Sequence, residues 1–72
     1  MNVIRRNIEA ERARLGMDKK GIAEKLGITT DTYRSYVNGG RISSASLERM
    51  SDLFDCSIDY LLGKTEVRKS AG

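Results

Sequence analysis

Residues 27–41, "GITTDTYRSYVNGGR", place small polar side chains at helical spacing together with two arginines. Their hydroxyl groups can donate and accept single hydrogen bonds, and the guanidinium groups can bind anions or the edge of a base. No histidine is present to act as a base near neutral pH. This chemistry favours binding over catalysis, and it requires an element that presents these groups on one surface.

Catalysis and metal binding find no support elsewhere in the chain. No stretch combines a nucleophile with a base and a group that would orient the base, so we expect no enzyme activity. Because Cys56 is the single cysteine, an internal disulfide and a Cys/His zinc site are excluded, and Cys56 is predicted to be a packed thiol. Four acidic residues have the spacing of a solvated face, so no metal or cofactor is expected: Glu48, Asp52, Asp55 and Asp59.

Length and charge narrow the class of protein. A chain of 72 residues allows one domain, and 39% hydrophobic with 32% charged residues is typical of a soluble globular protein. No apolar run approaches the ~18 residues of a membrane span, and "MNVIRRN" lacks the apolar core of a secretion signal, so we expect a cytoplasmic location. Residues 1–41 carry nine basic and five acidic side chains, whereas residues 42–62 carry one and four. The basic part is suited to phosphates.

The pattern of apolar residues predicts five short helices and no strand. Residues 2–15 read as the first amphipathic helix, which Gly16 ends. The N-caps of the four later helices are predicted at Asp18, Thr29, Ser43 or Ser44, and Ser57. Their ends are predicted at Gly27, at Asn38-Gly39-Gly40, after Phe54 and at Gly63. We assign residues 1–64 to one domain and residues 65–72 to a flexible basic tail.

Residues 18–38 have the form of a helix-turn-helix. A short capped helix, "DKKGIAEKLG", is followed by a sharp turn through Gly27 and by a second capped helix, "TTDTYRSYVNG". Such a motif lets the second helix enter a DNA major groove about 12 Å wide while the first lies across the backbone. The apolar side chains that share one core, with both tyrosines packed rather than stacking on bases, are predicted to be Ile22, Leu26, Ile28, Tyr33 and Tyr36.

Several stretches carry a resemblance to a known family: "IAEKLGI", the cap Thr29, "VNGGR" and the ending "CSIDYLLGK". With these, the sequence resembles the Cro/repressor family of helix-turn-helix regulators (lambda repressor-like, XRE family) over residues 3–64. The resemblance implies an all-α, compact five-helix bundle whose second and third helices form the helix-turn-helix. It also implies that the partner is double-stranded operator DNA.

Position by position, the resemblance assigns roles to the polar residues. A phosphate-gripping role at the start of the second helix falls on Lys19, base reading on Thr30, Asp31, Thr32 and Ser35, and backbone contacts on Asn38, Gly40 and Arg41. Helical periodicity independently places Asp31, Ser35 and Asn38 opposite the apolar face, with Arg34 on the flank. The predicted DNA-binding set is therefore Lys19, Lys20, Thr29, Thr30, Asp31, Thr32, Arg34, Ser35, Asn38, Gly40 and Arg41.

The sequence departs from the family pattern at positions that bear on binding. Lys19 stands where Gln is usual, although a lysine still holds a phosphate as a point charge. Val37 replaces a glutamate that many members pair with an arginine of the first helix, so Arg12 needs another acceptor or faces solvent. Gly21 costs its helix about 1 kcal/mol relative to Ala, without an evident purpose. Because only Arg34 offers a bidentate base contact, we predict a weakly binding monomer whose specificity needs a homodimer or readout of DNA shape.

Three functions are compatible with these features. The first is a small stand-alone transcriptional regulator, a Cro-like repressor of the phage or mobile-element type. The alternative is an antirepressor or modulator that docks on another repressor protein, as the acidic Asp31 in the reading helix and the acidic residues 42–62 would permit. The third is the antitoxin of a two-gene module, which would use the same fold. Reversing the charges of Lys19 and Arg41 distinguishes the first two functions: operator binding should be lost under the first, and partner binding should persist under the second.

Overall fold

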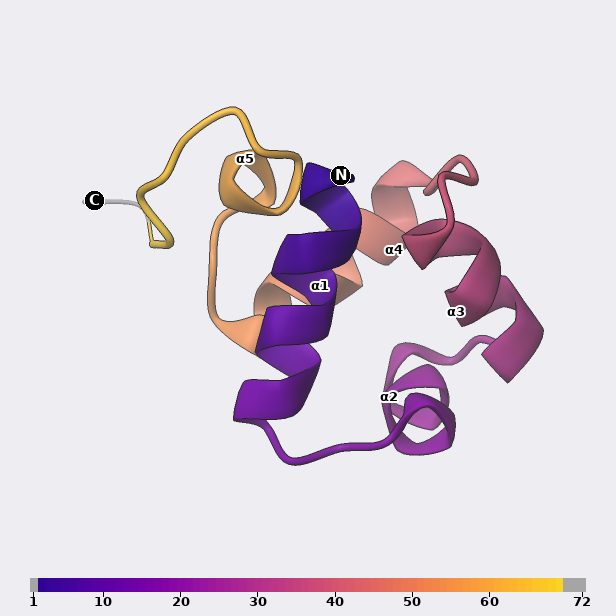
Figure 1. Ribbon diagram of the computed structural model, residues 1–72. Helices are drawn as coiled ribbons and strands as arrows, with labels where there is room; N and C mark the ends of the chain where they lie inside the picture. The colour runs from indigo at the N-terminus through magenta and orange to yellow at the C-terminus, as the bar shows by residue number, and fades with distance from the viewer. Residues whose placement is uncertain (1, 70–72) are drawn as a thin grey trace.

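The computed structural model describes residues 2–69, which form five α-helices without a strand (Figure 1). These helices are α1 (Val3–Arg14), α2 (Lys19–Leu26), α3 (Thr30–Val37), α4 (Ser44–Phe54) and α5 (Ile58–Leu61). They build a body of 32 × 22 × 21 Å, so the predicted all-α bundle is confirmed. None of the five combines the length and the apolar character that crossing a bilayer requires.

Side-chain caps determine where the helices begin. In the four later helices the side chain of the cap accepts a hydrogen bond from a backbone N–H of the first turn, at 2.7 to 3.2 Å, as predicted for Asp18, Thr29 and Ser57. Of the two serines predicted for α4, Ser43 is the cap. α1 begins one residue later than predicted, because Asn2 has an extended backbone and its Oδ1 accepts from Ile4 N at 2.9 Å. Such a cap contributes about 1 kcal/mol.

One apolar core is shared by all five helices. Its buried members are Ile8, Ile22, Ala23, Leu26, Tyr33, Val37, Met50, Phe54, Cys56 and Leu61. Tyr33 is fully buried and Tyr36 packs against the core, so the packing predicted for both tyrosines is confirmed. Cys56 is buried as predicted, and burial raises the pKa of its thiol. The solvated face predicted for the four acidic residues of positions 48–59 is also confirmed, because all four are exposed.

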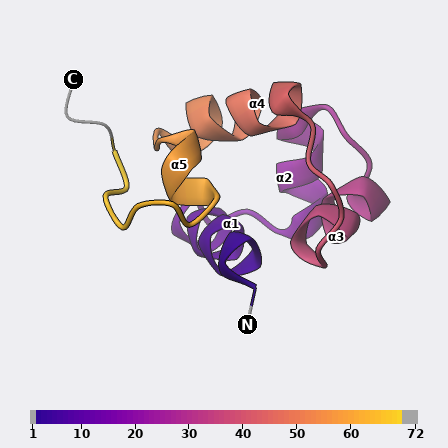
Figure 2. The ribbon, with the colours of Figure 1, turned by 90° about the horizontal axis from the view of Figure 1, so that it is seen from above.

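The turn between α2 and α3 places these two helices beside each other. Gly27 ends α2 with a left-handed φ of 71°, which glycine adopts without steric cost, and Ile28 N then donates to the Ala23 carbonyl at 3.0 Å. Arg49 of α4 donates to the Leu26 carbonyl at 3.2 Å and so satisfies the end of α2. Figure 2 shows α2 and α3 on one side of the bundle and α5 with the C-terminal segment on the other. The predicted helix-turn-helix is therefore confirmed.

Part of the C-terminal segment, residues 65–69, lies against the bundle. Arg68 reaches the carboxylate of Glu11 in α1 with its Nε at 2.9 Å and its Nη2 at 2.6 Å, and the Glu11 side chain is only 4% exposed. The assignment of residues 65–72 to a flexible tail stays a prediction, and its last three positions, 70–72, lie outside the described residues.

Candidate nucleic-acid interface

The outer face of α3 presents the polar side chains that were predicted to read bases. This face consists of Thr30, Asp31, Thr32, Arg34, Ser35 and Asn38, of which the two threonines are half-buried and the others exposed. Tyr33 and Val37 lie on the opposite face, in the core. The predicted orientation of α3 is therefore confirmed, while contacts between its outer face and bases stay a prediction.

Two tyrosines on the inner side of α3 form hydrogen bonds to the neighbouring helices α1 and α4. Tyr33 Oη donates to Glu9 Oε2 of α1 at 3.0 Å, and Tyr36 Oη lies 3.0 Å from Ser46 Oγ of α4. Both hydrogen bonds are partly shielded from water, which strengthens them and restricts the geometry of the side chains that they join. The outer face of α3 is therefore held in a fixed orientation, as recognition of another molecule requires.

Glu9 also supplies the acceptor that Arg12 needs. Arg12 Nε donates to Glu9 Oε2 at 2.5 Å, and its Nη1 donates to the Met17 carbonyl at 2.9 Å. Burial alone would raise the pKa of Glu9, but the hydrogen bonds from Arg12 and Tyr33 outweigh burial and lower it. Val37, in the place of the usual glutamate, is buried. The acid that links the first and third helices thus comes from the first helix in this protein.

Tyr33→Phe is expected to lower the free energy of unfolding by about 1–2 kcal/mol, because it removes a hydrogen bond to a charged carboxylate and keeps the buried ring. Urea denaturation followed by circular dichroism measures this loss. The matched variant Tyr36→Phe removes a neutral hydrogen bond to Ser46 and should cost about 0.5–1 kcal/mol. A Tyr33→Phe protein as stable as the parent would show that the bond to Glu9 does not help to hold α3.

The first turn of α3 uses part of its own hydrogen-bonding capacity. Thr29 Oγ1 accepts from Thr32 N at 3.1 Å and donates to Thr32 Oγ1 at 2.9 Å, so Thr29 caps the helix and has no proton left for a ligand. Thr32 keeps its own hydroxyl proton for an external acceptor. Arg34 Nη1 lies 3.4 Å from Asp31 Oδ1, with both side chains largely exposed. This pair keeps a guanidinium and a carboxylate together on the outer face of α3.

The start of α2 carries two of the predicted phosphate-binding residues. Lys19 and Lys20 are exposed in the first turn, and the charge of Lys19 helps to lower the pKa of Glu9. Asp18 Oδ1 accepts from Gly21 N at 2.7 Å, and a Cβ at Gly21 would lie only 3.0 Å from the same oxygen. The missing side chain at Gly21 lets this cap close tightly, which is a purpose that the sequence did not reveal.

The loop after α3 folds back on the end of the helix and carries Arg41, which is exposed. Gly40 N donates to the Ser35 carbonyl at 2.7 Å, and a Cβ at Gly40 would collide with the Ser35 carbonyl and hydroxyl. Only glycine therefore fits this close approach, so Gly40 has a packing role independent of any ligand. Among residues 2–69, no three His, Cys, Asp or Glu side chains gather as a metal ion would need.

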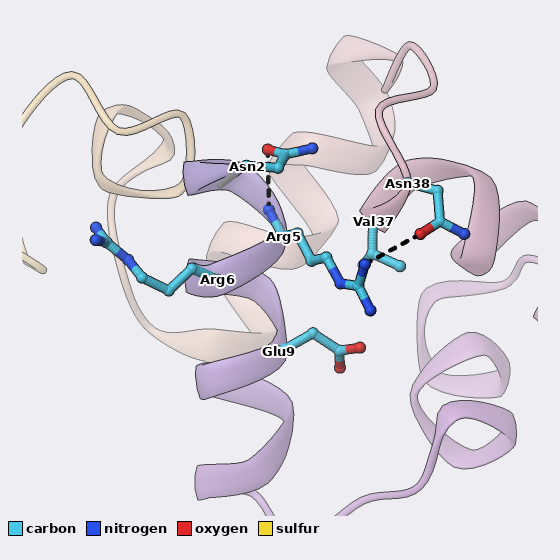
Figure 3. Close-up of a pocket in the computed structure, with 6 residues that line it drawn as sticks. All are labelled: Asn2, Arg5, Arg6, Glu9, Val37 and Asn38. Atoms are coloured by element: carbon cyan, nitrogen blue, oxygen red, sulfur yellow. Dashed lines mark hydrogen bonds between the residues drawn. The ribbon is translucent and has the colours of Figure 1, made fainter.

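Helix α1 also reaches this neighbourhood, which the sequence did not indicate. Arg5 Nη1 of α1 donates to Asn38 Oδ1 at 3.4 Å (Figure 3). Glu9, also on α1, accepts the hydrogen bond from Tyr33 of α3. The partners of these bonds are 33 and 24 residues apart in the chain, so no local pattern could signal either contact. The candidate interface therefore draws on α1, α2, α3 and the loop after α3.

Comparison with known proteins agrees with this architecture. The chain matches the helix-turn-helix family over residues 8–61, a range that contains α2 to α5 whole. It is also similar to the HTH-type transcriptional regulator ImmR of Bacillus subtilis (strain 168), with 35% identity over 65 residues. The alignment covers 89% of this chain and 51% of ImmR, so the chain spans about half the length of this relative. With both helices of the motif and the closing helix inside the match, the chain belongs to the helix-turn-helix family of the Cro/repressor type.

Proposed function

We propose that this protein is a DNA-binding transcriptional regulator that represses transcription by occupying an operator. The observation that carries the proposal is the outer face of α3, which is polar and largely exposed. Hydrogen bonds of Tyr33 and Tyr36 to α1 and α4 hold this helix in place. In helix-turn-helix proteins the second helix of the motif lies in the major groove, with its N-terminal residues against base edges. The similarity to ImmR, whose name describes a transcriptional regulator, supports the same function.

The side chains divide into those that position the protein and those that read sequence. Lys19, Lys20 and Arg41 are exposed cations beside α3, and each is suited to a backbone phosphate, which carries no sequence information. Thr30, Thr32 and Ser35 can make single hydrogen bonds to base edges and methyl contacts to thymine. Arg34 can bind a guanine edge with two hydrogen bonds, and Asp31 can accept from cytosine N4.

We infer that one copy of the chain binds DNA weakly and that a homodimer provides the affinity. The hydroxyl groups of α3 discriminate poorly between bases, so specificity rests on Arg34, on DNA shape and on the second copy. A homodimer would bind a palindromic operator with half-sites about 34 Å apart. A cytoplasmic location and a phage or mobile-element type of repressor are parts of the same proposal.

A second candidate function is that of an antirepressor that docks on another repressor protein. The observation that favours it is Asp31, whose carboxylate is 92% exposed in the first turn of α3. A carboxylate at this place is repelled by phosphates but would attract a basic protein surface. The exposed acidic residues of α4 and α5 add a second surface of the same sign.

Fluorescence anisotropy with labelled duplex DNA tests the proposal. One duplex comes from upstream of the protein's own gene, and the other has the same composition in scrambled order. We expect tight binding to the upstream duplex alone, with log K falling against log salt concentration by about 0.9 per phosphate contacted. Equally weak binding to both duplexes would contradict a repressor that reads an operator. The antirepressor function would then be tested by a pull-down against a partner repressor.

A further inference from the structure

A cleft of about 660 Å³ separates the beginning of α1 from the end of α3. It is lined by Asn2, Arg5, Arg6, Glu9, Val37 and Asn38. Figure 3 shows the Arg5 side chain extending across this cleft toward Asn38, while the guanidinium of Arg6 extends to the other side of α1. Two neighbouring arginines of one helix therefore present their charges to different surfaces, and only Arg5 faces the candidate interface.

The charge of Arg5 is not neutralised within the part of the chain that the structure describes. Residues 2–69 contain no ion pair to Arg5, although four other arginines in this range have one. Glu9, the acid of the same cleft, is already engaged by Arg12 and by the Tyr33 hydroxyl. Arg5 donates one N–H to Asn38 Oδ1, and its other guanidinium N–H groups remain available as donors.

The bond from Arg5 also orients Asn38. Because the guanidinium can only donate, the Asn38 side chain faces it with its carbonyl oxygen, and the amide Nδ2 points outward as a donor. Asn38 is exposed at the end of α3, directly before the loop that carries Arg41. An exposed amide and an uncompensated guanidinium thus stand side by side at this edge of the interface. Both are donors that suit an anionic oxygen.

We infer that Arg5 and Asn38 together bind a backbone phosphate of the DNA duplex that α3 enters. The inference rests on the proposed function and adds α1 to the surface that holds DNA. A phosphate rather than a base is the ligand, because base edges meet the N-terminal residues of the reading helix and Asn38 lies at its opposite end. Arg5 therefore contributes affinity without sequence preference.

The test compares Arg5→Ala with Arg6→Ala in anisotropy titrations of the full chain against the upstream and scrambled duplexes at several salt concentrations. Both arginines are exposed on the same turn of α1, so the two variants lose the same charge. We expect Arg5→Ala to weaken binding to both duplexes by roughly 5- to 10-fold near 0.1 M salt and to reduce the salt slope by about 0.9. Arg6→Ala should leave the slope unchanged, and Arg5→Lys should restore most of it.

The possible outcomes separate the two proposals. If the parent binds the upstream duplex and Arg5→Ala behaves like Arg6→Ala, the phosphate contact of Arg5 is wrong and the proposed function stands. If Arg5→Ala weakens only the upstream duplex, Arg5 reads a base, and the inference is again wrong. If the parent binds neither duplex, the proposed function fails and the inference fails with it. Thermal melts followed by circular dichroism verify that all three variants are folded.

Discussion

Reversing the charges of Lys19 and Arg41 together is expected to weaken binding to operator DNA by about 100-fold or more at near-physiological salt. Both side chains are exposed, one in the first turn of α2 and the other in the loop after α3. Under the proposed function, each substitution to glutamate would remove a phosphate contact and place a carboxylate near the phosphate instead. Anisotropy titration of the Lys19→Glu, Arg41→Glu protein measures the loss, and the salt slope should fall by about 2.

A matched double variant shows whether position or total charge is responsible. Lys64→Glu with Lys69→Glu changes the net charge equally, but at two exposed residues that follow α5, a helix on the far side of the bundle from α3 (Figure 1). We expect this protein to bind the operator within about 3-fold of the parent, because neither lysine belongs to the predicted DNA-binding set and charges without a direct phosphate contact act only through an attraction that salt screens. Equal losses in both double variants would contradict the proposed interface. Under the antirepressor function, the Lys19 and Arg41 variant would still capture the partner repressor.

Arg68→Ala is expected to lower the free energy of unfolding by about 2 kcal/mol, a large fraction of the stability of a chain of this size. The Glu11 carboxylate is 4% exposed and accepts two hydrogen bonds from Arg68, at 2.9 and 2.6 Å. Without Arg68, its remaining side-chain donor is Arg14, which is half-exposed and 3.1 Å away. The partial exposure of Arg68 itself keeps the loss below that of a fully buried pair. Urea denaturation at neutral pH measures it.

Lys69→Ala is the control, because Lys69 pairs with the exposed Asp55 and its loss should leave stability unchanged.

The pH dependence of the free energy of unfolding gives a second test of the pair between Arg68 and Glu11. The hydrogen bonds from Arg68 lower the pKa of Glu11 below the value of about 4.3 that an unfolded glutamate has. Such a carboxylate stabilises the fold above its unfolded pKa and loses this contribution as the pH falls through its folded pKa. The difference between parent and Arg68→Ala should therefore shrink below about pH 4.3, and a difference that stays constant there would contradict the assignment.

The sequence determined the helices, the caps of the four later ones and the outer face of α3, because each of these depends on residues within about one helical turn. Thr29 caps α3 through Thr32, three positions on, and Gly27 ends α2 by its own backbone conformation. The period of 3.6 residues likewise places Tyr33 inward and Arg34 outward without reference to the rest of the chain. The predicted helix-turn-helix was confirmed for this reason.

Only the tertiary structure decided which partners the charged side chains find. Tyr33 meets Glu9 across 24 residues, Arg5 meets Asn38 across 33, and Arg68 meets Glu11 across 57. Each of these pairs depends on where one element crosses another, and close packing of the shared core sets those crossings. The periodicity that places a side chain on a face does not say what stands opposite. Sequence therefore defined the surface that α3 presents, and the fold defined both the bonds that hold α3 in place and the cation of α1 beside it.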